Sequence, residues 1–414
     1  MSPPVRLARA DATSAPRFFE LELLDNRYPA LHGMRVLAIA SVVQYHVTLL
    51  FTLEERLPID PRWAAASLRV FFGMDLFFVL SGFLIGSILL RSVEESGSQG
   101  VARFYVRRAF RTFPLYYVLL TACALLVPLT PGQTRHLPLE YAYLTDYGDA
   151  TGAPVQCACA HGPPGSDFAF PWGWSLAIEE KFYLVVPLLF FLLRKLRGDA
   201  SRLALLLAMW TSALVVRLLI FSSRPGWTVD SLSDAIYYRS HTRYDALVAG
   251  VILAYVHRRW RAAIARRLER PGARAALALS ALACLWAIVR PDLFGERSVP
   301  LVLVFAWGTL TSLMYFACLL LLLHGDGLVQ RALSAPMFRR VATLGYGVYL
   351  VHMLLCAWPV AAVARWLRYG RGWPMSAVWP VSLALLLLVS LAVAYVLHVL
   401  VEKPFLRLRD RLAR

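Results

Sequence analysis

Apolar stretches of about 20 residues recur along the whole chain, and they restrict its fold more than any other feature. Each is close to the length that crosses the hydrocarbon core of a bilayer as a helix. The stretches lie at 34–53, 69–90, 113–129, 174–193, 203–221, 244–257, 275–290, 299–323, 341–364 and 377–400. Because lipid offers the backbone no hydrogen-bond partners, such a chain must pair its backbone groups within helices. We therefore predict an all-α, polytopic membrane protein, a bundle of about ten transmembrane helices.

Positive charge is spread between the apolar stretches and does not form one patch. The net charge of +17 would suit a nucleic-acid partner only if the basic residues lay together. Counted between the stretches, 29 of the 43 Lys and Arg residues lie on the side of the two termini and 12 on the opposite side. Cytoplasmic loops carry such an excess, so we predict cytoplasmic termini, contact with membrane lipid and no nucleic-acid partner.

This pattern divides the chain into three parts. Residues 1–30 are polar and basic, and they lack the apolar core and cleavage site of a removable signal peptide. We expect them to form a cytoplasmic N-terminal segment before a retained first span. Residues 31–404 hold all the apolar stretches and form the transmembrane domain, and residues 405–414 form a basic cytoplasmic tail.

Cysteine and histidine residues in the longest connection, 130–173, have a spacing found in metal sites. Cys157, Cys159 and His161 supply three ligands, whereas structural zinc sites usually close with four. We therefore predict no metal, and a disulfide made by these cysteines stays open. The other four cysteines lie in apolar stretches, where packing is the expected role.

The first apolar stretch carries two ionisable side chains. Arg35 lies near its start and His46 follows eleven residues later, so on a helix both point the same way, about 16 Å apart along the axis. An ionisable group at that depth is costly in hydrocarbon, which indicates a functional group that lines a cavity. The alternative is a neutral histidine that hydrogen-bonds a neighbouring helix.

Charged groups from four spans are expected at a similar depth, in the outer half of the membrane. Those that join His46 are Asp75, Glu179, Glu180, Arg243 and Asp245, and Tyr244 lies between the last two. A histidine oriented by a carboxylate is the arrangement for general base catalysis on a hydroxyl. Buried ion pairs between helices would satisfy the same charges, and that alternative stays open.

An arginine cluster lies on the side of the termini, before the third stretch. Arg107, Arg108 and Arg111 fall within about one helical turn. Guanidinium groups in such a cluster bind phosphate through bidentate hydrogen bonds. Positive loops and lipid head groups explain the same arginines without a ligand.

Other polar residues inside apolar stretches are expected to have structural roles. His352 and His398 are predicted to make hydrogen bonds in the packing, and Glu402 to pair with nearby arginines. Arg217 would either face the same cavity or extend to the edge of the bilayer.

Seven separate segments form one ordered pattern along the chain. They read LHGMRVLAIASVVQYH, GMDLFFVLSGFLIG, FYVRRAFRTFP, WSLAIEEKFYLVVP, RYDALVAG, LGYGVYLVH and VEKPF. Together they resemble the acyltransferase-3 family of membrane O-acyltransferases over nearly the whole chain after residue 30. The resemblance implies a transmembrane acyltransferase domain at 31–404 that moves an acyl group, commonly acetyl from acetyl-CoA, onto a hydroxyl.

By motif position, the resemblance assigns roles to particular residues. Arg35 and His46 match the family's R-x10-H pair, with His46 as the catalytic histidine, and we expect Glu180 or Asp75 to orient it. Arg35, Arg108 and Arg111 are the predicted donor-binding residues, the last two through the family's R-x-x-R motif. The W-S-L-x-x-E-E segment and its neighbours predict a substrate site of Trp174, Ser175, Glu179, Arg243, Tyr244 and Asp245.

Three positions depart from the family's pattern. His32 and Val36 replace the aspartate and the second glycine of the opening L-D-G-x-R-G motif, and Lys181 replaces a frequent glutamine. We expect altered surroundings for Arg35 and altered acceptor specificity, with His46 unaffected. Some family members carry an extracytoplasmic hydrolase-like domain after the bundle. Without one, a second transfer step is expected to need a separate protein.

The predicted function is that of an O-acyltransferase in the bacterial cytoplasmic membrane. Acyl-CoA, expected to be acetyl-CoA, is a co-substrate and not a permanently bound cofactor; its phosphates would lie near Arg108 and Arg111. His46 would either take the proton of an acceptor hydroxyl or carry the acyl group itself. The acceptor is expected to be a glycan or a glycosylated molecule, and the residues decide neither its identity nor the acyl chain length.

Two other classes of membrane protein use intramembrane charges. A transporter or flippase would use them as a substrate path, but the sequence shows neither the internal repeats nor the paired short helices typical of that class. A glycosyltransferase that uses a lipid-linked sugar would need a large extracytoplasmic domain or an acidic first outer loop. Residues 52–68 give that interpretation little support.

Overall fold

A computed structural model describes residues 20–68, 71–147, 168–290 and 299–412. All regular secondary structure in these ranges is helical, which confirms the predicted all-α class. The α-helices are α1 (Pro29–Leu49), α2 (Pro61–Leu68), α3 (Gly73–Leu126), α4 (Pro131–Tyr141), α5 (Trp174–Lys195), α6 (Asp199–Ser222), α7 (Val229–Leu232), α8 (Ser240–Arg243), α9 (Asp245–Leu268), α10 (Pro271–Val289), α11 (Val299–Phe305), α12 (Thr311–His324), α13 (Leu328–Leu333), α14 (Pro336–Thr343), α15 (Gly345–Val351), α16 (Ala357–Arg365), α17 (Met375–Leu397) and α18 (Lys403–Leu412).

The predicted spans fall in these helices, although not one for one. Seven helical stretches of the described residues are long and apolar enough to cross a membrane. They are Pro29–Thr52, Pro61–Leu126, Asp199–Ser222, Pro271–Val289, Val299–His324, Gly345–Gly370 and Met375–Leu412. The predicted spans 174–193 and 244–257 lie in α5 and α9. Residues 73–90 and 113–126 of two predicted spans both belong to α3, which has a non-helical residue at Gly97 with φ of +51°, a value that favours glycine.

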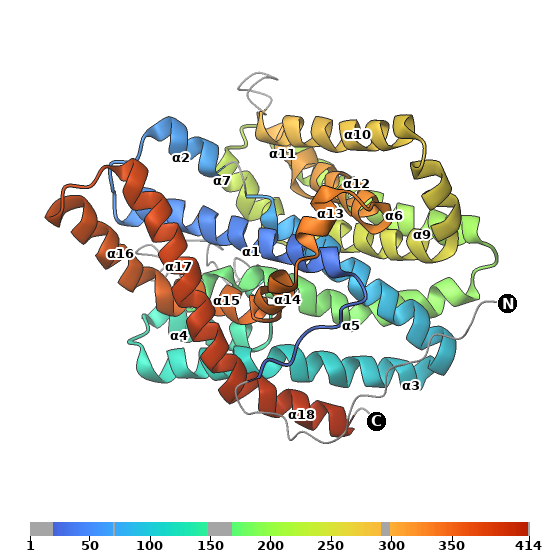
Figure 1. Ribbon diagram of the computed structural model, residues 1–414, viewed down its shortest axis with the longest axis horizontal. Helices are drawn as coiled ribbons and strands as arrows, with labels where there is room; N and C mark the ends of the chain where they lie inside the picture. The colour runs from blue at the N-terminus through green and yellow to red at the C-terminus, as the bar shows by residue number, and fades with distance from the viewer. Residues whose placement is uncertain (1–19, 69–70, 148–167, 291–298, 413–414) are drawn as a thin grey trace.

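Helices α3 and α9 make the most extensive contact in the bundle, and glycine lets them approach closely. A Cβ atom on Gly82 of α3 would lie 1.9 Å from the carbonyl oxygen of Leu247. A Cβ atom on Gly250 of α9 would lie 2.2 Å from the carbonyl oxygen of Val79. This contact fixes the start of α3 beside the start of α9, where several predicted site residues lie. Figure 1 shows α1, α3 and α9 extending along the long axis of the molecule, with α17 crossing α1 obliquely.

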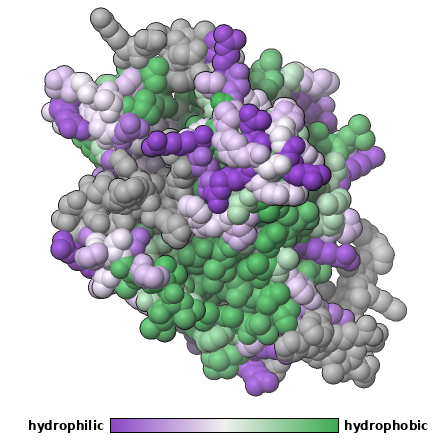
Figure 2. Space-filling view, turned by 90° about the vertical axis from the view of Figure 1, so that its left-hand side faces the viewer, coloured by the Kyte–Doolittle hydropathy of each residue, from purple (hydrophilic) through white to green (hydrophobic). Residues whose placement is uncertain are grey.

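Large apolar side chains remain exposed on the outside of the bundle. On α5, Leu188 is 66% exposed, and on α17, Leu388 is 65% exposed. Figure 2 shows one face of the molecule, where a broad hydrophobic area is bordered by hydrophilic side chains. An apolar surface of this extent on single helices is typical of helices that face lipid.

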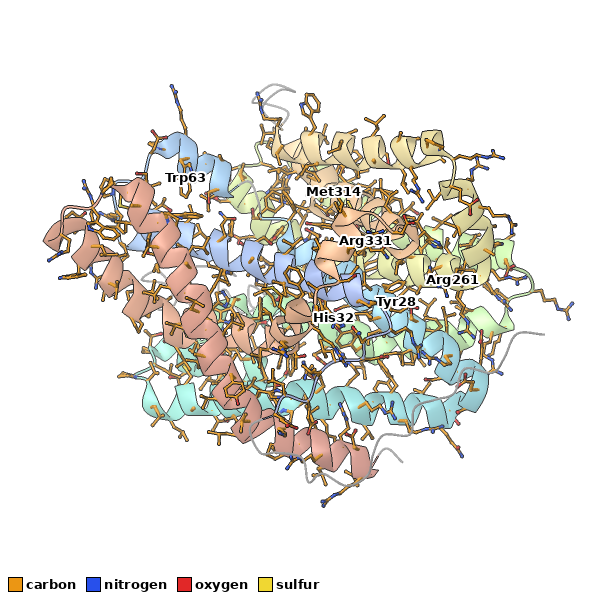
Figure 3. The ribbon with its side chains drawn as sticks, viewed as in Figure 1. Tyr28, His32, Trp63, Arg261, Met314 and Arg331 are labelled. Carbon is orange, nitrogen blue, oxygen red and sulfur yellow. The ribbon has the colours of Figure 1, made fainter. Side chains whose placement is uncertain are left out.

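Figure 3 shows which elements lie toward each end of the bundle, with Arg261 of α9 at one end and Trp63 of α2 toward the other. The ring of Tyr28, just before α1, lies 5.9 Å from the ring of His257 in α9, so α1 begins near the end that holds Arg261. The ring of Trp63 packs on that of Trp379 in α17, with 4.1 Å between centroids. The sequence positions Cys157, Cys159 and His161 lie outside the described residues.

Candidate functional site

A cavity of about 1070 Å³ opens among α1, α3, α5, α15 and α18. We call it the arginine cavity because seven arginines contribute to its lining: Arg27, Arg35, Arg91, Arg107, Arg108, Arg111 and Arg409. Its wall also includes residues just before α1 and residues of α18, such as Glu22 and Leu406. The cavity thus brings together all three arginines that the sequence predicts for donor binding.

The two arginines of the R-x-x-R motif are held in different ways. The guanidinium of Arg108 lies over the ring of Tyr183, 4.1 Å from its centroid, and Arg108 Nε is buried without a hydrogen-bond partner among the described residues. Arg111 Nη1 lies 3.7 Å from Glu402 Oε2, and Arg111 Nη2 donates to the carbonyl oxygen of Thr343 at 3.1 Å. The predicted pairing of Glu402 with an arginine is therefore present. Arg108 keeps donor capacity toward the cavity.

Arg35 reaches the same cavity from α1 and interacts electrostatically with Arg108 and Arg111. Within the described part of the chain, neither Arg35 nor Arg108 forms an ion pair with a carboxylate. His32, which replaces the family's aspartate one turn before Arg35, is buried beside α13 and α14 (Figure 3). A neutral or cationic histidine here cannot neutralise Arg35, so this wall of the cavity favours an anion.

The W-S-L-x-x-E-E segment begins α5 and lines the opposite wall. Glu179 Oε1 accepts a hydrogen bond from Ser81 Oγ at 2.8 Å, and Glu179 Oε2 accepts one from Tyr183 O–H at 3.0 Å. Glu180 also lines the cavity, and its carboxylate interacts with Arg108. Both carboxylates therefore lie with the arginines.

His46 lies in a second, smaller pocket of about 30 Å³, the space of one water molecule. We call it the histidine pocket. Its other walls are mainly aromatic: Val42, Tyr45, Phe71, Met74, Trp172, Trp174, Tyr237, Tyr238 and Tyr349. Of the predicted substrate-site residues, Trp174 lines this pocket, while Ser175 lines the arginine cavity.

The two cavities meet. Met74 and Tyr349 line both of them. On α1, Arg35 and Ile39 line the arginine cavity, and Val42 and His46 line the histidine pocket. Residues of this spacing lie on one side of a helix, so α1 leads from the arginines to the histidine as its sequence predicts.

The His46 side chain hydrogen-bonds another histidine, and it also has a hydrogen bond to the backbone of Val42. His46 Nδ1 lies 3.0 Å from His352 Nε2, and both side chains are buried. The sequence favours a carboxylate, Glu180 or Asp75, in this place. Helix packing instead brings α15 and the segment after it against α1 and directs the carboxylates elsewhere. The sequence predicts only a packing role for His352 and not its position beside His46. The one available signal is that His352 ends the family segment LGYGVYLVH.

Asp75 has a different partner. Its Oδ1 accepts a hydrogen bond from Arg243 Nη2 at 2.8 Å, and both side chains are fully buried. The guanidinium of Arg243 also lies 4.5 Å from the centroid of the Tyr237 ring, behind the wall of the histidine pocket. The pair joins the start of α3 to α8, and this is the buried ion pair that the sequence left as an alternative.

Asp245 and Tyr244 also make contacts between helices. Asp245 Oδ2 accepts from Arg217 Nη2 at 2.8 Å, and Arg217 Nε donates to the carbonyl oxygen of Val304 at 2.9 Å. Arg217 therefore faces inward, and its hydrogen bonds connect α6, α9 and α11. The Tyr244 hydroxyl lies 2.6 Å from Ser212 Oγ on α6. Neither Tyr244 nor Asp245 contributes to the lining of either cavity.

A buried carboxyl outside the spans positions part of the pocket wall. Glu140, at the end of α4, is fully buried, and its Oε1 accepts a hydrogen bond from the backbone N–H of Phe170 at 2.6 Å. Burial raises the pKa of Glu140 to about 8. Phe170 stacks on Trp172 with 5.5 Å between ring centroids, so Glu140 supports the aromatic wall from behind. Lys181, at the third departure from the family's pattern, pairs with Asp146.

Comparison with known proteins extends these observations. The family described as an acyltransferase domain matches residues 28–399. Peptidoglycan O-acetyltransferase OatA of Listeria monocytogenes is 27% identical over 78% of this chain and 48% of its own length. The putative peptidoglycan O-acetyltransferase YrhL of Bacillus subtilis is 26% identical over 82% of this chain and 51% of its own length. A putative O-acetyltransferase of Staphylococcus aureus is 27% identical over 55% of this chain and 34% of its own length. The chain thus spans about half the length of these relatives or less, and no solved structure matches it significantly.

Proposed function

Because this chain belongs to the acyltransferase 3 family, we propose that it transfers an acetyl group from acetyl-CoA to a hydroxyl of peptidoglycan or a similar envelope glycan. Two of its relatives carry peptidoglycan O-acetyltransferase in their names. The observation that carries the proposal is the junction at Met74 and Tyr349 between a cavity rich in arginine and a pocket that holds a buried histidine. A polyanionic donor and a proton-accepting group would there be neighbours.

The proposed orientation follows from charge. We place both termini in the cytoplasm, with ten spans between residues 31 and 404, a cytoplasmic segment at 1–30 and a basic tail at 405–414. The excess of Lys and Arg on the side of the termini supports this placement. The arginine cavity is lined by residues from just before α1 and from α18, so it lies on that same side. Acetyl-CoA would then enter from the compartment in which it is made.

Donor binding is assigned to the arginine cavity. Arg35, Arg108 and Arg111 present guanidinium groups from two helices, and such groups bind phosphate oxygens in bidentate fashion. The cavity is large enough for a nucleotide-sized ligand. Glu179 and Glu180 are proposed to hold Arg108 and Tyr183 in place. With the phosphates at the arginines, the pantetheine arm would reach toward Ser175 and the shared wall at Met74 and Tyr349.

His46 is the proposed catalytic residue. In one route, His46 accepts the proton of the acceptor hydroxyl while the hydroxyl oxygen attacks the thioester carbonyl. The C–S bond then breaks, and the CoA thiolate takes that proton from His46. In the other, a neutral His46 attacks the thioester carbonyl, and the C–S bond breaks to give an acetyl-imidazolium and the CoA thiolate. The acceptor oxygen then takes the acetyl group as the N–C bond breaks, and the hydroxyl proton passes to the thiolate. Trp174 and its aromatic neighbours leave space for about one water molecule beside His46, which would limit hydrolysis of the acetyl-imidazole.

The test uses purified protein, isotopically labelled acetyl-CoA and soluble peptidoglycan fragments, with labelled O-acetyl ester read by mass spectrometry. We expect His46→Ala to lose about 10²–10⁴-fold in rate. The matched control is His257→Ala, because His257 is a buried histidine whose Nδ1 also bonds a histidine, His324, at 3.2 Å, away from both cavities. A His46→Ala protein that keeps the parent rate would overturn the proposal. So would a parent that forms no ester but moves a solute or lipid across vesicle membranes, since that is the behaviour of a transporter.

A further inference from the structure

Two imidazole rings from opposite ends of the chain form a buried pair beside the histidine pocket. His46 Nδ1 and His352 Nε2 are 3.0 Å apart, and the ring centroids are separated by 5.0 Å. His352 is fully buried and His46 is 7% exposed. A second bond continues from the far side of His352, where Nδ1 lies 2.7 Å from the carbonyl oxygen of Tyr349. His46, His352 and the carbonyl of Tyr349 thus form a chain of hydrogen bonds, and Tyr349 lines both cavities.

The chemistry of the partners fixes where the protons lie. A carbonyl oxygen can only accept, so His352 Nδ1 carries the proton that it donates to Tyr349. In a neutral ring, His352 Nε2 is then the acceptor, and His46 Nδ1 must be the donor. His46 therefore carries its proton on Nδ1 and its lone pair on Nε2. These tautomers are assigned from the hydrogen-bond network.

We infer that His352 is a positioning residue that holds His46 in the tautomer with a basic Nε2, and this inference rests on the proposed function. In a catalytic triad a carboxylate performs this task, because it accepts from the imidazole and stabilises the imidazolium. A second imidazole accepts the same bond without bringing an ion into hydrocarbon, where an isolated charge is costly. The carboxylates of this region meanwhile have other partners, Arg243 for Asp75 and Ser81 with Tyr183 for Glu179.

The surroundings of His352 hold its ring in place. The helix changes from α15 to the π-helical segment His352–Cys356 at this residue, and π-helical turns are frequent at functional sites. The hydroxyl of Tyr349 donates to the carbonyl oxygen of Trp172 at 2.8 Å and lies 2.5 Å from Ser175 Oγ. Ser175, the serine of the W-S-L segment, thus helps to fix the side chain of the tyrosine whose backbone carbonyl accepts from His352.

The experiment compares three single variants by steady-state kinetics with acetyl-CoA and a peptidoglycan fragment. His352→Phe keeps a flat ring but removes the acceptor, and we expect kcat to fall about 10²–10⁴-fold with the KM for acetyl-CoA unchanged. His352→Gln restores an acceptor oxygen, and we expect its kcat to be at least about tenfold higher than that of His352→Phe. One charge-assisted hydrogen bond contributes about this factor. The matched control His257→Phe, which removes the same type of pair away from the cavities, should keep the parent kcat.

Several outcomes would overturn the inference. Equal rates for His352→Phe and His352→Gln would show that His352 contributes only to packing. A His352→Phe protein with the parent rate would show the same. If His352→Phe does not fold, His352→Leu replaces it, and the comparison with His352→Gln stands. His46→Ala, assayed in parallel, separates the two hypotheses. An active His46→Ala protein would contradict the proposed function. If His46→Ala is inactive and His352→Phe is fully active, only the proposed role of His352 is contradicted.

Discussion

Arg108 offers the sharpest test of donor binding, because its geometry gives both the change and its size. We predict that Arg108→Gln weakens acetyl-CoA binding while the fold is kept. The Arg108 guanidinium lies over Tyr183 and forms no ion pair in contact distance among the described residues. The carboxylate of Glu180 interacts with it only at longer range, so the change breaks no hydrogen-bonded ion pair. Glutamine keeps two of the three methylene groups of the arginine side chain and a polar end, which limits the loss of packing.

The expected magnitude follows from the bonds that are lost. A hydrogen bond to a charged group is worth about 1.5–3 kcal/mol, which corresponds to roughly 10- to 150-fold in affinity. The nearby carboxylate of Glu180 would face the donor's phosphates after the change, so the upper part of this range is expected. Arg108→Lys should lie between the parent and Arg108→Gln, because lysine keeps the charge but loses the planar fork and the stacking on Tyr183.

The assay is isothermal titration of the detergent-purified protein with CoA, together with the KM for acetyl-CoA. The control is Arg103→Gln, which removes an equal charge from the same helix at an exposed position outside the cavity lining. We expect the dissociation constant of Arg103→Gln to stay within about twofold of the parent, since exposed charges contribute little. Equal dissociation constants for Arg108→Gln and the parent would refute the assignment of the arginine cavity to the donor. Equal losses in both variants would show only a general effect of net charge.

Two further predictions concern stability. Asp75→Asn should lower the melting temperature strongly, because it leaves Arg243 as an uncompensated buried charge at a cost of about 3–5 kcal/mol. The double variant Asp75→Leu with Arg243→Met should restore much of the lost stability. A double variant no more stable than Asp75→Asn would contradict the ion-pair interpretation. Burial raises the pKa of Glu140 to about 8 from an ordinary value of 4.5, so the folded state binds the proton more tightly than the unfolded state. The contribution of Glu140 to stability should therefore be fully present below pH 4.5 and be lost as the pH rises to about 8, by at most about 5 kcal/mol. Melting curves of Glu140→Gln should lack this part of the slope. Parallel pH slopes for Glu140→Gln and the parent would show that Glu140 ionises as it does in the unfolded chain.

The helical class and the family could be predicted because both depend on local sequence. Apolar stretches of bilayer length form helices wherever they occur, since each helix satisfies its own backbone groups. The prediction that α1 connects Arg35 with the pocket of His46 needed only the periodicity of one helix.

The pairing of side chains between helices could not be predicted from the sequence. His46, Asp75 and Glu180 are expected at a similar depth in the membrane, and at that depth each carboxylate has several possible cationic partners. Depth along the membrane normal says nothing about rotation around each helix axis or about which helices are neighbours. The structure pairs Asp75 with Arg243 and His46 with His352.

The sequence by itself determined that this chain is a helical membrane protein of the acyltransferase 3 family, with an arginine and a histidine on one side of its first span. Only the tertiary structure decided the partners: a histidine 306 residues away for His46, an arginine for Asp75, and one cavity for arginines from α1 and α3. The physical reason is that helix formation depends on neighbours a few residues apart. The contacts of a buried polar group depend instead on close packing between helices, such as that of Gly82 against α9, which no single stretch of sequence encodes.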